Sequence, residues 1–558
     1  MAVPGDAACR PVMPCGAGTW GDIPIDATTV YVDQSYVGAD SDGSATKPWA
    51  RIGDAISGAA PGALIAIAQG SYVGDLRISG KLLRLWGVCP EKVEVVGDIE
   101  GGAAVGILNL AEGTEVHGIA LRGPSFGVVV TGSREVVLDR LWVHHTGSRG
   151  IAVQRDLGPT AATVTSSLVE QCHDAGVRFS GSEGRVEGTL VRETQPRSSD
   201  QRFGRGISIQ LSCTDAGVCD PTARANATVM GSLVQQNHAF GVFVGGSDAH
   251  IETTVVRGTL PDASDQRFGS GIVIQLGCSN GVCDASTRAN ATVKSSVIEQ
   301  NYETGLLVGG SDVAVESTVV RGTLPQQSDL RDGRGINAQD CGVTDGCTPP
   351  VRSTLTLARS LVDQNHDIGV ATFGSDATID ATVVRNTLSR ASTQSAGRGI
   401  NAQLGCNIDF ECDPNTPSNL LLQGSLIENN RDVGVYISGS SGTLRTSAVR
   451  STVPRDYDGF FGDGVAVLSD GAPASAVLET MLIEQSARAG VSSFGGVASL
   501  ERVTIRCASF DIAGEPYNGA TFGFEDIGRN QCGCPDAQAS CLAVSAGLAP
   551  PEAIGSVQ

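Results

Sequence analysis

The sequence is poor in aromatic residues, in lysine and in long apolar runs. Phe, Trp and Tyr together make up 4% of the 558 residues, and lysine occurs only at positions 47, 81, 92 and 294. No apolar stretch approaches the roughly 20 residues of a membrane-spanning helix, so we expect no membrane span. The 39 basic and 60 acidic residues leave a formal charge of −21. That charge argues against nucleic acid and anionic membranes as general partners.

The first residues, MAVPGDAACRPVMPCG, have no apolar signal core. The chain nevertheless has sixteen cysteines, many in close pairs, which indicates an oxidising compartment. We therefore expect a secreted, periplasmic or cell-surface protein from which an export signal has been removed. The alternative is a cytosolic protein with many free thiols.

A repeat organises the chain. The string VVRGTL at 255–260 returns at 319–324, as VVRNTL at 383–388, and more loosely as LVRETQ from 190 and AVRSTV from 448. Its arginine falls at Arg192, Arg257, Arg321, Arg385 and Arg450, in steps of 64 or 65 residues. So regular a period is typical of a repeat architecture.

Each repeat contains two turns of chain, one near 21 residues and one near 43 with two added loops. Short β-branched segments separated by Gly and Asn predict a parallel β-solenoid, in which each coil stacks on the last. Roughly fourteen coils are expected, about 4.8 Å apart. A chain of β-hairpins is the alternative, but it needs tight Asn-Gly or Asp-Gly turns that do not recur here.

The predicted domains are a capping segment at 1–75, the solenoid at 76–506 and a Cys-rich cap and tail at 507–558. Within the first cap, Ile52, Ala55, Ile56 and Ala59 recur at helical spacing after Pro48. A cap at each end would protect strand edges that otherwise promote aggregation.

Asn237, Asn301, Asn365 and Asn430 repeat at one position, which predicts a buried Asn column that bonds the backbone of neighbouring coils. The next position holds His173, His238, Tyr302, His366 and Arg431. Consecutive members would lie about 9–10 Å apart, too far to share a metal ion, so we expect no metal site and no cofactor.

Five loops of equal length follow the repeated arginines, each reaching the next Gly in 14 residues. We call residues 193–205, 258–270, 322–334, 386–398 and 451–463 the shelf loops, because loops of equal length on stacked coils should pack side by side. They repeat an Asp at 200, 265, 329 and 458, an Arg at 202, 267 and 331, and a Phe at 203 and 268. One hypothesis is that Asp–Arg pairs hold the loops together. The other is a polar groove that binds an anionic polymer through arginine. The candidate binding residues are Arg192, Arg257, Arg321, Arg385, Arg450, Asp200, Asp265, Asp329, Arg202, Arg267, Arg331, Phe203 and Phe268.

Cysteine pairs recur in the second loop of each repeat, which predicts the disulfides Cys213–Cys219, Cys278–Cys283, Cys341–Cys347 and Cys406–Cys412. Cys9 and Cys15 are spaced for a small disulfide loop. Cys507, Cys532, Cys534 and Cys541 fit two disulfides in a terminal cap, or else a four-Cys zinc site. Cys89 and Cys172 are either buried thiols or a pair.

Coil length, the Asn column and the pattern SxVxxN…GV, as at 296–301 and 305–306, resemble right-handed parallel β-helix proteins of the pectin-lyase-like superfamily. The resemblance covers about 76–505 and implies an all-β, right-handed parallel β-helix. The segment YVDQSYVGADSDGSATKPWARIGDAI is similar to a small domain of unknown function that precedes such helices in secreted bacterial proteins. The hydrolase strings Asn-Thr-Asp, Asp-Asp, Gly-His-Gly and Arg-Ile-Lys are absent. Trp142-Val143-His144-His145 is similar to a lyase motif, but His144 replaces its calcium-binding acid.

An enzyme needs one unique constellation of residues, whereas a binding protein can repeat the same contacts. The polar residues that stand out here repeat. We therefore expect an exported β-helix protein, not an enzyme, that binds a polysaccharide or another cell-surface polymer along the shelf loops. A polysaccharide lyase or glycoside hydrolase with an unfamiliar site is the alternative.

Overall fold

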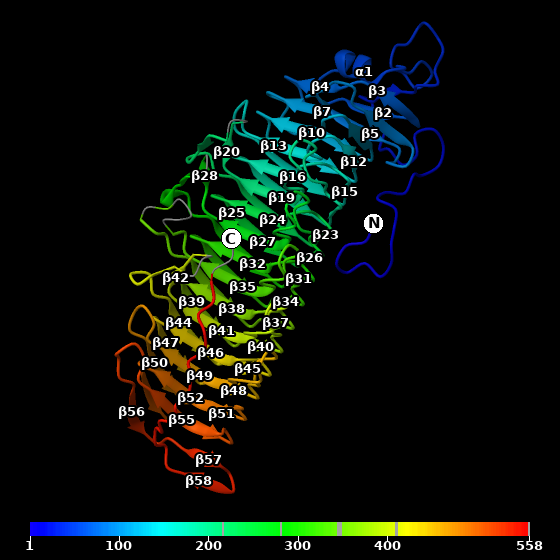
Figure 1. The fold of residues 1–558 in the computed structure, drawn as a ribbon. Helices are drawn as coiled ribbons and strands as arrows, with labels where there is room; N and C mark the ends of the chain where they lie inside the picture. Colours follow the sequence, from blue (N-terminus) through cyan, green and yellow to red (C-terminus); the bar gives the residue numbers. More distant parts are fainter. Residues whose placement is uncertain (215–216, 280–281, 343–346, 348, 408–410, 556–558) are drawn as a thin grey trace. The chain divides into compact units, whose positions relative to one another are not determined.

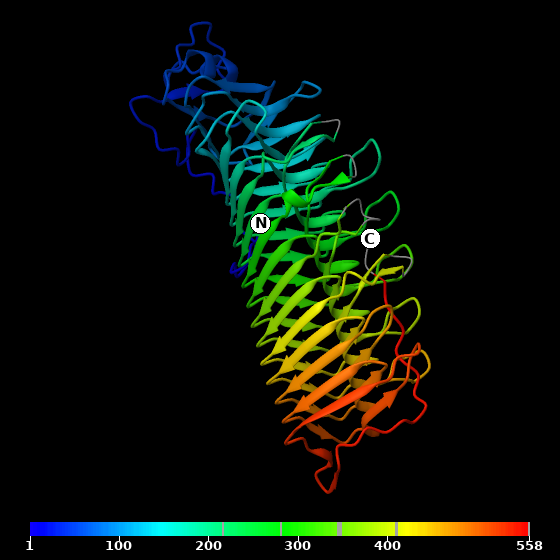
Figure 2. The ribbon, with the colours of Figure 1, turned by 90° about the vertical axis from the view of Figure 1, so that its left-hand side faces the viewer.

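The computed structural model describes residues 1–214, 217–279, 282–342, 347, 349–407 and 411–555 (Figure 1). The chain forms two compact units, unit 1 (Met1–Asp265) and unit 2 (Gln266–Gln558). Each unit is a right-handed parallel β-helix in which most coils contribute one short strand to each of three parallel sheets. The coils of β1 (Val30–Val32) and β56 (Gly523–Gly528) contribute to one sheet only. The prediction of a parallel solenoid is confirmed, and the alternative of stacked hairpins is wrong. In Figure 2 the strands of unit 2 lie one above another, one per coil.

The first strand of each coil belongs to sheet 1. In unit 1 these strands are β1 (Val30–Val32), β2 (Leu64–Ile67), β5 (Arg84–Gly87), β8 (Glu115–His117), β11 (Val136–Asp139), β14 (Ala161–Thr165), β17 (Glu183–Glu187), β22 (Asn226–Met230) and β25 (Asp248–Glu252). In unit 2 they are β30 (Asn290–Lys294), β33 (Asp312–Glu316), β36 (Thr354–Ala358), β39 (Asp376–Asp380), β44 (Asn419–Gln423), β47 (Ser441–Arg445), β50 (Ser475–Glu479), β53 (Val497–Glu501) and β56 (Gly523–Gly528).

The second strand belongs to sheet 2. In unit 1 these strands are β3 (Gly70–Val73), β6 (Val93–Val96), β9 (Ala120–Gly123), β12 (Trp142–Thr146), β15 (Leu168–Glu170), β18 (Leu190–Arg192), β23 (Leu233–Gln235) and β26 (Val255–Arg257). In unit 2 they are β31 (Val297–Glu299), β34 (Val319–Arg321), β37 (Leu361–Asp363), β40 (Val383–Arg385), β45 (Leu426–Glu428), β48 (Ala448–Arg450), β51 (Leu482–Glu484) and β54 (Thr504–Arg506).

The third strand belongs to sheet 3, which follows the shelf loops. In unit 1 these strands are β4 (Leu76–Ser79), β7 (Ala103–Leu108), β10 (Phe126–Thr131), β13 (Ile151–Gln154), β16 (Ala175–Ser180), β19 (Arg205–Gln210) and β24 (Phe240–Gly245). In unit 2 they are β27 (Ser270–Gln275), β32 (Thr304–Gly309), β35 (Arg334–Gln339), β38 (Ile368–Phe373), β41 (Arg398–Gln403), β46 (Val433–Ser438), β49 (Asp463–Leu468), β52 (Ala489–Phe494) and β55 (Phe510–Glu515).

Period-2 alternation of apolar residues places one face of every strand inside the coil. In unit 2, Ile336, Val370, Ile400, Val435 and Val465 are register partners on successive coils of sheet 3 and have no exposed surface. Burying a side chain of this size contributes roughly 1.5–3 kcal/mol. The stacked columns are therefore the main source of stability. Small aliphatic residues fill most positions, and Phe179, the register partner of Val153 and Ile209, is a buried aromatic among them.

The turn between sheets 2 and 3 carries the predicted Asn column. Asn430 is 1% exposed; its Oδ1 accepts a hydrogen bond from the backbone N–H of Thr387 at 3.1 Å, and its Nδ2 donates to the carbonyl oxygen of Val384 at 3.2 Å. Asn237 and Asn365 make equivalent bonds. The column holds consecutive coils at a fixed spacing.

The N-terminal segment contains the predicted helix, α1 (Ile52–Gly58), with Ile52, Ala55 and Ile56 buried. Two-stranded hairpins carry three of the cysteine loops: β20 (Ser212–Cys213) with β21 (Cys219–Asp220), β28 (Cys278–Ser279) with β29 (Val282–Cys283), and β42 (Gly405–Cys406) with β43 (Cys412–Asp413). A short 3₁₀ turn, η1 (Ala285–Thr287), follows the second hairpin, and β57 (Cys532–Cys534) pairs with β58 (Ala537–Ala539) near the C-terminus.

Seven disulfides are present, and the four predicted loop pairs are among them. Cys507–Cys534 and Cys532–Cys541 form the two C-terminal bonds, so the zinc alternative is wrong. The predicted Cys9–Cys15 loop is also wrong. Cys15 is instead bonded to Cys89, 74 residues away, and leaves Cys9 as an exposed thiol. Cys172 is a buried thiol. Spacing alone favoured the nearby partner, but the fold brings a distant cysteine closer.

No helix in the part of the chain that the structure describes is long and apolar enough to cross a membrane.

Candidate functional site

The five repeated arginines lie at the ends of sheet 2 strands, and each is hydrogen-bonded to a side chain one coil earlier. The Nε–O distances are 2.7 Å for Arg192–Glu170, 3.0 Å for Arg257–Gln235, 2.9 Å for Arg321–Glu299, 3.2 Å for Arg385–Asp363 and 2.9 Å for Arg450–Glu428. Strand register also aligns Arg192 with Gln235 and Gln235 with Arg257, so residues 65 apart lie two coils apart, as predicted. These arginines form ladders that bind one coil to the next.

Neighbouring shelf loops are joined by hydrogen bonds within each unit, as expected for loops that pack side by side. In unit 1 the N–H of Ser264 donates to the carbonyl oxygen of Gln201 at 3.1 Å. In unit 2 Ser328 donates to Gln266, Ser392 to Leu330 and Tyr457 to Gln394, at 3.1, 3.0 and 2.8 Å. Within each unit, the shelf loops therefore lie side by side next to sheet 3 and are joined by backbone hydrogen bonds.

The repeated loop aspartates close their own loops. Asp200 accepts a hydrogen bond from Arg197 Nε at 3.2 Å and one from the backbone N–H of Arg202 at 3.1 Å. Asp329 accepts from the backbone N–H of Arg331 at 2.9 Å and pairs with its guanidinium at 3.5 Å. Among the other candidate binding residues, Arg202 is exposed in unit 1, and Asp265 is exposed at the end of that unit. Arg267 and Phe268 are half-buried in unit 2.

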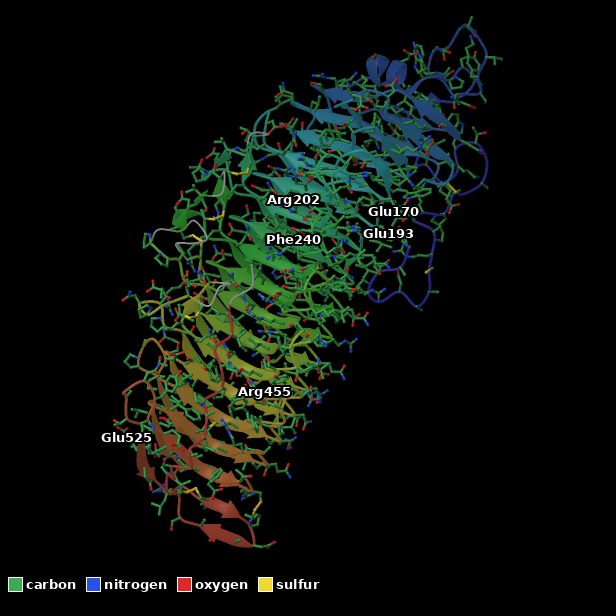
Figure 3. The ribbon with its side chains drawn as sticks, in the orientation of Figure 1. Glu170, Glu193, Arg202, Phe240, Arg455 and Glu525 are labelled. Carbon is green, nitrogen blue, oxygen red and sulfur yellow. A yellow bond between two sulfur atoms is a disulfide. The ribbon has the colours of Figure 1, made fainter. Side chains whose placement is uncertain are left out.

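Beside its shelf loop, unit 1 holds a stack of arginine and phenylalanine on the outer face of sheet 3. The Arg197 and Arg205 guanidiniums lie 4.4 and 4.2 Å from the ring centre of Phe203. Arg205 also lies 4.3 Å from the ring of Phe243, which stacks on Phe240 at 5.6 Å. Figure 3 labels Arg202 and Phe240 beside these strands. The Arg205 guanidinium therefore makes cation–π contacts with both rings.

Two more arginines join Arg205 around one buried carboxylate. Arg149 Nε donates to Asp174 at 2.8 Å, and Asp174 is 8% exposed. Arg178, on β16, is half-buried and is the register partner of Ser208 on β19. We call Arg149, Arg178, Arg205 and Asp174 the arginine cluster. Its formal charges sum to about +2 when all four groups are ionised.

Two guanidiniums of this cluster lack a hydrogen-bond partner at Nε within the part of the chain that the structure describes. The Nε atoms of Arg178 and Arg205 are buried and have no hydrogen-bond partner among the described residues. Burial, together with the charge of Arg149, lowers the pKa of Arg178 to about 9. Burial lowers the pKa of Arg205 to about 10 against the opposing effect of Asp174. Burial raises the pKa of Asp174, but Arg149, Arg205 and Arg178 outweigh it and hold that pKa below its ordinary value. An added anion would relieve this accumulation of positive charge.

The cluster arises where a repeated ion pair is broken. In unit 2, Arg334 Nε donates to Asp367 at 3.0 Å and Arg398 Nε donates to Asp432 at 2.7 Å, each one coil later. Arg205 occupies the equivalent position in unit 1, but the corresponding residue one coil later is Ala239. Arg205 therefore lacks the carboxylate that its equivalents have.

The complementary break lies in unit 2. Ser270 takes the arginine position, and its hydroxyl donates to Glu303 at 3.0 Å. Glu303 is 1% exposed, and its Oε1 has no partner among the described residues. Burial, followed by the nearby Asp332, raises the pKa of Glu303 to about 8. A neutral carboxyl at this position needs no arginine.

The acid column was not predicted from the sequence, although the same period reveals it. Asp174, Ala239, Glu303, Asp367 and Asp432 directly follow the His column, in steps of 64 or 65. The arginine position directly precedes the repeated Gly of sheet 3. Because the two columns are about 30 residues apart in the chain, only the fold shows that they pair.

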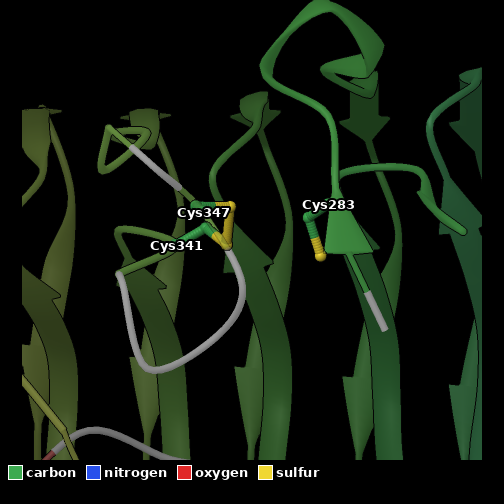
Figure 4. A group of neighbouring side chains, drawn as sticks. All are labelled: Cys283, Cys341 and Cys347. Carbon is green, nitrogen blue, oxygen red and sulfur yellow. A yellow bond between two sulfur atoms is a disulfide. The ribbon is translucent and has the colours of Figure 1, made fainter. Parts of the chain in front are cut away.

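Three cysteine sulfurs in unit 2 are close enough together to bind a metal ion, but they are disulfide sulfurs and not thiolates. Cys283, Cys341 and Cys347 lie within 4.8 Å of one another (Figure 4). Cys341 and Cys347 are bonded to each other, and Cys283 is bonded to Cys278. Disulfide sulfurs lack the thiolate charge that binds zinc, so this group is two adjacent disulfides.

No protein-family model matches the sequence, and no curated protein matches it significantly. Similar solved structures include a pectate lyase with 15% identity and a TM-score of 0.36, which covers 63% of this chain and 79% of the lyase. A periplasmic alginate epimerase has 12% identity and a TM-score of 0.34, covering 82% and 79%, and the Dettilon tailspike protein has 13% and 0.32, covering 90% and 70%. These proteins are parallel β-helices, the fold of this chain.

Proposed function

We propose that this is an exported binding protein for an acidic polysaccharide, and that the polymer binds in unit 1 at the arginine cluster and along the adjacent shelf loop. One observation carries the proposal: the half-buried Arg178 and Arg205 lie beside Arg149, share the Asp174 carboxylate with it, and have buried Nε atoms without a hydrogen-bond partner among the described residues. A uronate carboxylate or a sulfate group would supply the missing acceptor, and guanidinium groups bind such anions in a bidentate manner.

The surroundings suit a sugar polymer. The exposed Arg202 and the half-buried Phe203 lie on the shelf loop that borders the cluster, which provides a second cation and an apolar edge. The formal charge of −21 opposes non-specific binding of polyanions, so the local excess of arginine would select one site. Seven disulfides favour an oxidising compartment, where extracellular and cell-surface polysaccharides are found.

The test is calorimetric titration with a homogeneous oligogalacturonate, with a neutral glucan as the comparison ligand. Arg178→Gln/Arg205→Gln should weaken binding at least tenfold, and rising salt should weaken binding by the wild-type protein. The matched control is Arg185→Gln, because Arg185 pairs with Glu187 on sheet 1 of the same unit at 2.8 Å. Equal loss in the control, or equal affinity for the neutral glucan, would contradict the proposal.

The enzyme alternative makes a separate prediction. A lyase would release unsaturated products from the same oligogalacturonate, and a hydrolase would release reducing ends. Binding without either product supports a binding protein, whereas release of product that Arg178→Gln/Arg205→Gln abolishes would assign catalysis to this cluster.

A further inference from the structure

The outer face of sheet 3 in unit 2 is covered by the chain's own C-terminal segment. Residues 544–555, which we call the tail segment, run back across the strands from β55 to β35 (Figure 1). Six coil steps of about 4.8 Å span about 29 Å, and eleven extended residues reach about 36 Å. The tail segment is therefore nearly extended. It pairs with β55 at Val544, in a parallel bridge to Ala513, and then crosses the strands.

Side chains of sheet 3 bind this segment mainly through its carbonyl oxygens. Arg488 Nη1 donates to Ala549 at 2.8 Å, the Tyr436 hydroxyl to Pro551 at 3.3 Å, and Arg334 Nη2 to Gly555 at 2.6 Å. Arg398 Nη2 and Gln403 Nε2 donate to the carbonyl oxygens of Glu552 and Ile554.

One carboxylate and two apolar side chains complete the contact. Arg455, from a shelf loop, donates to the Glu552 carboxylate at 2.7 Å. Ile554 is 4% exposed and packs against Ile368, Ala371 and Phe373, and Leu548 packs against the cluster around Tyr436 and Phe494.

The groove thus supplies mainly donors to residues 549–555. Backbone N–H groups of the tail segment donate in the other direction at Ala546 and Leu548, to Glu515, and at Ile554, to Gln403. Pro550 and Pro551 have no backbone N–H, so this part of the tail segment presents carbonyl oxygens without unpaired donors. Oxygen acceptors in a row with an acidic group beside them are also the features of an extended acidic polysaccharide. Arg334 and Arg398 occupy the positions that Arg205 holds in unit 1. Their Nε atoms are paired with Asp367 and Asp432, so it is their Nη2 atoms that donate to the tail segment.

We infer that unit 2 contains a second acidic-polysaccharide site, formed by Arg334, Arg398, Arg455 and Arg488, and that the tail segment is a ligand mimic that keeps this site closed. This inference rests on the proposed function for its ligand class. Displacement of the segment exposes these guanidiniums to the polymer, so the binding capacity of the protein depends on whether the tail segment is seated.

The experiment releases the tail segment in a chain that lacks the unit 1 site. Ile554→Asp places a charge in the apolar contact with Ile368 and Phe373, and it is combined with Arg178→Gln/Arg205→Gln in the full-length protein. Titration with oligogalacturonate should show binding at least tenfold weaker than wild type for Arg178→Gln/Arg205→Gln alone, and one tighter site per chain when Ile554→Asp is added. A synthetic peptide of residues 548–555 should compete with the oligosaccharide.

A second variant keeps the test decisive. Removal of residues 547–558 leaves the contacts of Glu515 with Ser545 and Ala546 in place, and circular dichroism and thermal unfolding report whether the coils remain folded. Absence of binding by both folded variants would overturn the inference, even if the wild-type protein binds the polymer through unit 1. Binding by the released variants without binding by the wild type would contradict only the proposed site in unit 1.

Discussion

Arg398 Nε donates to Asp432 Oδ2 at 2.7 Å, and each of these side chains is 2% exposed. The same two positions in unit 1 hold Arg205 and Ala239. Arg334 and Arg398 each have a carboxylate one coil later, whereas Arg205 has Ala239 at that position. We make four predictions, three about these arginine and acid positions and one about the disulfides.

Ala239→Asp should restore the missing ion pair. Ala239 has a φ of 58°, close to the 59° of Asp432, and Asp tolerates this left-handed conformation better than Ala does. A hydrogen bond between charged groups should raise the free energy of unfolding by about 1.5–3 kcal/mol. Because Arg205 then has an acceptor, binding of oligogalacturonate should weaken at least tenfold. Urea unfolding and calorimetric titration measure the two effects. Stronger polymer binding in this variant would contradict the assigned role of Arg205.

Arg398→Met should leave the buried Asp432 carboxylate without its ion-pair partner. Loss of one partner of a buried pair costs about 3–5 kcal/mol, because the remaining charge is left unpaired. Urea unfolding of the variant should show this loss. Arg185→Gln, which removes one partner of a partly exposed pair on sheet 1, should change stability much less. Similar losses for the two variants would show that burial of the pair has no special importance.

Glu303→Gln should change how stability depends on pH. The pKa of Glu303 is raised to about 8 by burial and by Asp332, so the folded protein holds this proton more tightly than the unfolded chain does. The contribution of Glu303 to stability is therefore full below the unfolded pKa of about 4.5, and it is lost as pH rises toward about 8. The slope is at most about 1.4 kcal/mol per pH unit.

The Gln variant should lack this slope and be more stable than wild type at the alkaline end of that window. Urea unfolding across the window measures it. Glu299→Gln is the matched control, because Glu299 pairs with Arg321 at 2.9 Å and should show no such gain. A pH slope that is the same in wild type and in Glu303→Gln would mean that Glu303 is ionised throughout.

The disulfides should differ in how much they stabilise the fold, according to the length of the loop that each closes. Cys278 and Cys283 close a ring with a sequence separation of 5, and Cys15 and Cys89 one of 74. The chain-entropy relation gives about 2 kcal/mol for the short ring and about 4.5 kcal/mol for the long one. Cys278→Ser/Cys283→Ser should therefore loosen one loop and leave the coils folded, whereas Cys15→Ser/Cys89→Ser should lower the melting temperature further. Thermal unfolding and limited proteolysis compare them. Global unfolding of the first variant would show that its loop supports the coils.

The sequence by itself determined the repeat, the coil and the parallel stacking. A period of 64 or 65 residues with period-2 apolar alternation is a local pattern, and only stacked coils bury it, so Arg192 and Arg257 could be placed two coils apart before the structure was known. The four in-register cysteine pairs were predictable for the same reason, since both partners lie within a few residues of each other.

The tertiary structure decided which side chains meet across coils. Whether Arg205 finds a carboxylate depends on residue 239, which is 34 positions away, and Cys15 is bonded to Cys89 because the fold brings them together. The course of the tail segment over sheet 3 is set by contacts as distant as Arg334 with Gly555. The repeat period marks the arginine and acid columns, but it does not say which columns pair or where the tail segment lies, because that geometry exists only after the coils have stacked.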